Sequence, residues 1–165
     1  MNPLIEKITD LLRKELQLYG AMMAELEKQQ DSVVTRQVEA LLMTVDDLNH
    51  LAAEAVTLRR SRDEARSQLA TELGHPSDIP LTELLPALPE SSQIQIQALI
   101  QENNNVLRRA SRRTVQNHML LSRSIELMEE FISTLLPGQT TKVYGGDGRT
   151  YKNNTANRST LEVVG

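Results

Sequence analysis

The 165-residue sequence contains no cysteine and no tryptophan, and only one phenylalanine and three tyrosines. The absence of cysteine excludes disulfide bonds, thiol catalysis and thiolate metal sites, and it fits a reducing compartment. Aromatic side chains supply much of the volume of an ordinary globular core. A chain with so few of them, but with abundant Leu, Ala, Gln, Glu and Arg, is typical of long helices packed side by side.

Long hydrophobic runs and an excess of basic charge are also missing. Charged residues interrupt every apolar stretch, so no transmembrane helix is expected, and the first residues, MNPLIEKITDLL, do not have the form of a signal peptide. The formal net charge of −4 gives no general attraction to nucleic acid or to acidic lipid. We therefore expect a cytoplasmic protein without stable membrane insertion.

Hydrophobic periodicity predicts three long helices. Asn2 is a good N-cap and Pro3 a good first residue for a helix that begins almost at once. A second helix stops at Gly74 and Pro76, and a last helix runs from about residue 90 to residue 136. The Pro-rich stretch between them supports only a short helical turn, with an apolar cap of Leu81, Leu84, Leu85 and Leu88. Apolar residues at steps of three and four residues mark the side of a helix that packs against another helix, which we call its seam. The predicted seam of the second helix is Val38, Leu41, Val45, Leu48, Ala52 and Ala55.

Short connections favour antiparallel neighbours, so the residue numbers of the second and last helices should sum to roughly 160 where the two helices pass. The predicted fold class is all-α: an elongated antiparallel helical hairpin or bundle of three long helices with a short Pro-rich helical turn. This helical coiled-coil domain is predicted to cover residues 1–137. Residues 138–165 are polar, rich in Gly and Asn and without periodicity, which predicts a disordered, flexible tail.

The seam of the last helix is half polar. Steps of three and four residues place Asn103, Thr114, Asn117 and Ser124 among the apolar residues that would face a neighbouring helix. Polar positions lower the apolar area buried per turn, and they leave a surface that can exchange between self-packing and a guest helix. The alternative is that they fix register and oligomer state, as buried Asn does in coiled coils. The residues by themselves leave both interpretations open.

The sequence offers no catalytic constellation and no cofactor-binding or metal-binding pattern. His50, His75 and His118 have no ligand spacing. No strand is expected before the Gly-rich VYGGDGR stretch and neither a helix nor a GK[ST] sequence after it, so it does not predict a phosphate-binding loop. The RRASRR sequence at 108–113 is basic, but no aromatic residues are interleaved with it to stack on bases. We predict that the protein is not an enzyme and uses no cofactor.

The order of these parts resembles the FlgN-type flagellar export chaperones. A Leu-rich N-terminal helix precedes a second helix that ends in RRSRDEARSQL, and a Leu- and Pro-rich insert leads to a helix that opens on QENNNVL. The VYGGDGR sequence at 143–149 is similar to the Tyr and Gly that this family often carries just past its last helix. The resemblance extends to about Arg149, and the residues that it carries over are Asn103, Asn104, Leu107, Tyr144 and Gly148.

The resemblance implies a non-enzymatic cytoplasmic chaperone of type III flagellar export. Such a protein would bind an amphipathic C-terminal helix of the hook-associated proteins of the hook–filament junction and deliver them to the export gate. Its partners would be these proteins and the export apparatus; alone it would be a monomer, with a homodimer left open. The lack of periodic hydrophobic residues and the Gly content of the tail predict that it is a docking element, with Tyr144 and Gly148 as its docking residues. The resemblance implies that the C-terminal helix binds the client, and the predicted client-binding residues are those of its seam: Asn103, Leu107, Ala110, Thr114, Asn117, Leu121, Met128, Phe131 and Leu135.

Two other functional classes stay open from the sequence. One is a homodimeric coiled-coil adaptor or scaffold that has no client. The other is a nucleic-acid-binding regulator that uses the Arg108–Arg113 cluster, which would bind DNA in a salt-dependent way. The acidic net charge disfavours the second class.

Overall fold

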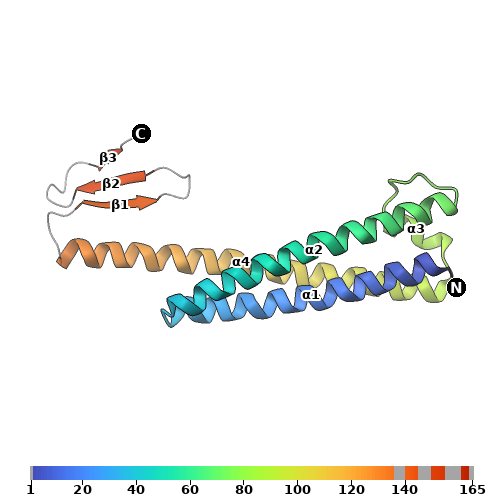
Figure 1. The fold of residues 1–165 in the computed structure, drawn as a ribbon, viewed down its shortest axis with the longest axis horizontal. Helices are drawn as coiled ribbons and strands as arrows, with labels where there is room; N and C mark the ends of the chain where they lie inside the picture. The colour runs from blue at the N-terminus through green and yellow to red at the C-terminus, as the bar shows by residue number, and fades with distance from the viewer. Residues whose placement is uncertain (1, 136–139, 145–149, 155–160, 164–165) are drawn as a thin grey trace. The chain divides into compact units, whose positions relative to one another are not determined.

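The computed structural model of the protein describes residues 2–135, 140–144, 150–154 and 161–163. The chain divides into two units, Met1–His118 and Met119–Gly165. The predicted all-α bundle of three long helices with a short Pro-rich turn is confirmed, whereas the division at residue 137 stays a prediction. The helical elements are α1 (Pro3–Val34), α2 (Val38–Glu72), α3 (Leu81–Leu84), the 3-10 turn η1 (Leu85–Ala87) and α4 (Glu90–Leu135) (Figure 1).

The start of α1 and the end of α2 follow the capping signals of the sequence, whereas the capping signal that the sequence offers at Asp31 and Ser32 lies inside α1, and α2 begins after Gln37 without a side-chain cap. The side-chain oxygen of Asn2 accepts a hydrogen bond of 2.8 Å from the backbone N–H of Leu4 at the start of α1. After α2, Gly74 has a φ of 75°, and the N–H groups of Gly74 and His75 donate back to carbonyls of the last helical turn. This ending needs a left-handed residue, which glycine provides without strain.

Three apolar clusters join the long helices of the first unit. The first cluster lies at the end that holds the N-terminus and α3 (Figure 1), and it includes Leu85 and Leu88 of the Pro-rich segment, as predicted. The second contains Leu18, Tyr19, Ala55 and Val106, and the third contains Met23, Leu26 and Ala110. The other buried members of the first cluster are Ile5, Ile8, Leu12, Ala65, Leu69 and Ile96.

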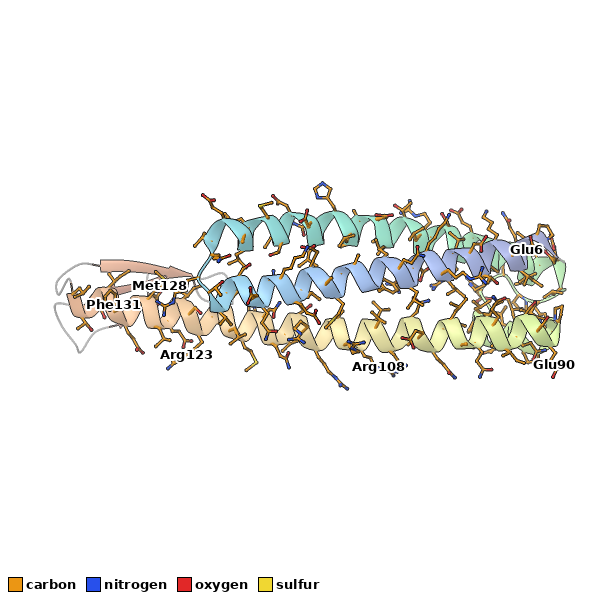
Figure 2. The ribbon with its side chains drawn as sticks, turned by 90° about the horizontal axis from the view of Figure 1, so that it is seen from below. Glu6, Glu90, Arg108, Arg123, Met128 and Phe131 are labelled. Atoms are coloured by element: carbon orange, nitrogen blue, oxygen red, sulfur yellow. The ribbon has the colours of Figure 1, made fainter. Side chains whose placement is uncertain are left out.

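The three long helices alternate in direction. Ala55 of α2 and Val106 of α4 share the second cluster, which is the antiparallel register predicted for these helices. α1 and α4 are therefore parallel, and Figure 2 shows Glu6 and Glu90, near the starts of these two helices, at the same end of the bundle. The backbones of α1 and α2 approach each other more closely than α4 approaches either of them.

A buried ion pair between Glu15 of α1 and Arg62 of α2 joins the two helices. Glu15 is 1% exposed, and its Oε2 accepts hydrogen bonds from Arg62 Nη1 of α2 over 2.8 Å and from the Tyr19 hydroxyl over 3.3 Å. Burial raises the pKa of the Glu15 carboxyl, and the neighbouring Arg62 opposes this rise. The other carboxyl oxygen has no hydrogen-bond partner among the described residues. The ionised carboxyl therefore depends mainly on Arg62.

Parts of the tail form three short strands, β1 (Thr140–Tyr144), β2 (Thr150–Asn154) and β3 (Leu161–Val163). They pair antiparallel in the order β1-β2-β3, and Tyr144 lies opposite Thr150 in the first pair. The sequence predicts no regular structure here, because it lacks an apolar alternation that would mark a buried face. The strands consist largely of Thr, Val, Tyr and Lys with two Asn, and the β-branched and aromatic residues among them favour extended backbone.

Candidate functional site

The side of α4 that faces the other helices changes character along its length. Up to Asn117 it is packed inside the bundle, and beyond Asn117 no described residue of the helix is buried. The buried residues are Ser92, Ile96, Asn103, Val106, Ala110 and Asn117. The two parts of this seam therefore differ in their surroundings.

Two buried asparagines hold α4 against the backbone of α1. Asn103 Nδ2 donates to the carbonyl of Leu12 over 3.1 Å, and Asn117 Nδ2 donates to the carbonyl of Leu26 over 2.8 Å. Both asparagines are 3% exposed. Asn117 also donates to Gln29 Oε1 over 2.9 Å.

These two contacts repeat the same geometry along the parallel helices. Each joins residues 91 positions apart, so the two asparagines and the two carbonyls have the same spacing of two heptads. Loss of either acceptor would leave a buried amide unpaired, at a cost of about 1–3 kcal/mol. Asn103 and Asn117 therefore act as buried attachment points of α4 on α1.

Beyond Asn117 the same side of α4 continues as an exposed apolar face, which we call the distal stripe. Leu121, Ile125, Met128, Phe131 and Leu135 follow one another at steps of three and four residues. Their exposed fractions are 37, 48, 60, 64 and 60%, and Figure 2 labels Met128 and Phe131 on this part of the helix. At 1.5 Å per residue the stripe is about 21 Å long. A contiguous apolar face of this kind is suited to docking another helix.

Five of the nine predicted client-binding residues belong to the first unit. Asn103, Ala110 and Asn117 are buried, and Leu107 packs on the second cluster. Thr114 is exposed, and its hydroxyl donates to the carbonyl of Ala110 in its own helix. A guest helix would reach the buried three only after α4 separates from α1.

The other four predicted residues, Leu121, Met128, Phe131 and Leu135, belong to the distal stripe. Ile125 was not predicted, because the predicted seam steps from Leu121 to Ser124, which is next to Ile125 in the sequence. Of the predicted docking residues, Tyr144 is the last residue of β1, and Gly148 lies outside the described residues.

Of the four arginines of the 108–113 sequence, Arg108, Arg109 and Arg112 are exposed, and Arg113 is half-buried. Arg113 donates a hydrogen bond to Gln30 of α1. Arg108 donates to Asn105 of its own helix over 2.6 Å and points away from α1 in Figure 2. Among the residues that the structure describes, no group of His, Asp and Glu side chains could hold a metal ion. None of the described helices combines the length and the apolar character that a membrane span requires.

The sequence matches a known protein family over most of its length. The model of the FlgN family, described as FlgN protein, matches residues 1–152, which include the bundle, all of α4 and strand β1. No curated protein and no solved structure matches the chain. Because the match covers nearly all of the 165 residues, the chain belongs to the FlgN family, a family of chaperones for flagellum assembly and export, as the resemblance in the sequence implies.

Proposed function

We propose that this protein is a cytoplasmic export chaperone that binds an amphipathic C-terminal helix of hook–filament junction proteins and delivers them to the flagellar export gate. The main support for this proposal is the exposed apolar face of α4, the distal stripe. The side of α4 that is buried up to Asn117 continues as an apolar face on which Met128, Phe131 and Leu135 are at least 60% exposed. We place the primary client contact on this stripe.

The side chains of the distal stripe suit a helical guest. Phe131 offers a large flat anchor, and Met128 is a flexible side chain that adapts to the surface it meets. Burial of each large apolar side chain contributes about 1.5–3 kcal/mol, so a few such residues suffice for a reversible complex. Binding of this kind needs no covalent chemistry and no nucleotide, which agrees with the chaperone role of the family.

Met128→Glu should weaken binding of a synthetic peptide with the sequence of a junction protein's C-terminal helix by about 100-fold, because a carboxylate would be buried in an apolar interface. Met119→Glu is the matched control. Met119 is 65% exposed, against 60% for Met128, and it lies nine residues earlier on the opposite side of α4. Calorimetric titration measures the affinities, and circular dichroism checks that both variants keep their helix content. Equal losses in the two variants, or no loss in either, would contradict the proposal.

We also propose that the tail docks on the export machinery through Tyr144 and Gly148. The three strands pair with one another, so their pairing does not require the helices of the bundle. Deletion of residues 139–165 should leave the thermal unfolding of the bundle nearly unchanged and reduce secretion of the junction proteins. Tyr144→Ala in the full chain should reduce secretion in the same direction. A large fall in Tm on deletion would show instead that the tail stabilises the helices.

A further inference from the structure

α2 carries a second heptad seam on a side that does not face the core, and we call it the outer seam. The residues of this seam are spaced alternately four and three positions apart, and all of them are exposed. Val38, Leu42 and Val56 are 65, 59 and 59% exposed, and Val45 is 40% exposed. The outer seam consists of Val38, Leu42, Val45, Asn49, Ala52 and Val56.

The core-facing side of α2 is made of other residues. Thr44 and Ala55 are buried, Leu48 packs on the third cluster and Leu51 on the second. The seam predicted from the sequence combined residues of both sides, since Leu48 and Ala55 face the core whereas Val38 and Val45 are exposed. α2 therefore has two apolar sides, and the outer one is uncovered in the described structure.

The outer seam has the form of a two-stranded coiled-coil face. In heptad terms Leu42, Asn49 and Val56 occupy a positions, and Val38, Val45 and Ala52 occupy d positions. Five of the six are apolar, and the exception is an Asn at an a position. A single Asn at this position specifies a two-stranded, in-register pair, because its amide bonds to the same residue of the other helix.

We propose that the outer seam is a self-association face, on which α2 of a second copy of this chain lies parallel, with the two Asn49 side chains paired across the two-fold axis. An unrelated apolar helix would leave the Asn49 amide buried without a partner. A second copy in register supplies a matching amide by symmetry. A second copy of the same chain is therefore the partner that satisfies the Asn49 side chain of the outer seam.

Charge also favours the parallel arrangement. Asp46 follows Val45 and flanks the seam at an e position. In an antiparallel pair centred on the seam, Asp46 would face Asp46 of the second copy. In a parallel pair it faces the apolar Leu41 of the second copy, and no like charges meet.

The size of the seam sets the strength of the association. It spans about 27 Å of helix at 1.5 Å per residue, and its side chains are mostly small. The buried area would lie at the low end for specific interfaces, so we expect a reversible, concentration-dependent dimer. The interface uses α2 and not the distal stripe, so it is independent of the proposed client binding.

Sedimentation equilibrium of the full chain over a range of concentrations tests self-association. The average mass should rise from that of the monomer towards that of the dimer, and Leu42→Glu should hold it at the monomer. The matched control is Met43→Glu, because Met43 is 66% exposed, adjacent in sequence and off the seam, and this variant should dimerise like the wild type. A wild type that stays monomeric, or equal behaviour of the two variants, would overturn the inference. Both variants should bind the junction-protein peptide normally, so failure of peptide binding in the wild type would count against the proposed function alone.

The orientation can be tested by cross-linking, because the natural chain contains no cysteine. Val38→Cys and Val56→Cys place one thiol at either end of the seam. In the parallel pair each variant forms a disulfide with its own copy, since equivalent positions meet. In an antiparallel pair the equivalent positions would be separated by about 27 Å, whereas a disulfide requires Cα atoms within about 7 Å. A disulfide that forms only when the two variants are mixed would overturn the parallel arrangement, and Met43→Cys should form none.

Discussion

Replacement of Arg62 with Met should lower the free energy of unfolding by about 3 kcal/mol at neutral pH, because it leaves a buried carboxylate without its main partner. Glu15 is 1% exposed and accepts its shorter hydrogen bond, 2.8 Å long, from Arg62. Methionine preserves much of the aliphatic length of arginine, but only the Tyr19 hydroxyl then remains as a donor to Glu15. Urea denaturation followed by circular dichroism measures the loss.

The effect of Arg62→Met should depend on pH. Burial raises the pKa of Glu15 and Arg62 opposes the rise, so removal of Arg62 raises this pKa further. A carboxyl whose pKa is higher in the folded state takes up a proton on folding; the resulting stability is present at acid pH and is lost as the pH rises through the folded pKa. The destabilisation should therefore be smallest at or below the ordinary Glu pKa of 4.5 and should grow towards neutral pH.

The double variant Glu15→Gln with Arg62→Met separates charge from packing. Gln carries no charge at any of these pH values, so the double variant should regain most of the stability lost at neutral pH and show a flatter pH dependence. If it is as unstable as Arg62→Met alone, the loss comes from the packing of the Arg62 side chain. A loss that does not change with pH would contradict the account of the buried charge.

Ile96→Ala should lower the free energy of unfolding by about 3 kcal/mol, the middle of the range for a large-to-small change in a core. Ile96 is fully buried in the first cluster, where α1, α2, the Pro-rich segment and α4 meet. Ile94→Ala is the matched control, because Ile94 belongs to the same helix but is 64% exposed. That substitution should change stability by less than about 0.5 kcal/mol. Similar losses in the two variants would show that the first cluster does not hold α4 in place.

The sequence by itself determined the start of α1 and the end of α2, but not the break between these two helices, where Gln37 makes no side-chain capping hydrogen bond. The cap at Asn2 and the left-handed Gly74 act through hydrogen bonds to residues a few positions away, so they can be read locally. Short connections also determined the antiparallel register of α2 and α4, since Ala55 and Val106 meet where the residue numbers predict. The strands of the tail were not predicted, because strand pairing joins segments that are separate in sequence and have only a weak local signal.

Only the tertiary structure decided what each apolar or polar seam residue does. Two overlapping patterns of three and four residues run along α2, and the packing of α1 and α4 selects the one that contains Leu48 and Ala55 for the core. The sequence places Asn103 and Asn117 on the seam of α4, but their acceptors are backbone carbonyls of α1. Periodicity describes a single helix, whereas burial and hydrogen bonding across a seam depend on which helix lies opposite and in which register.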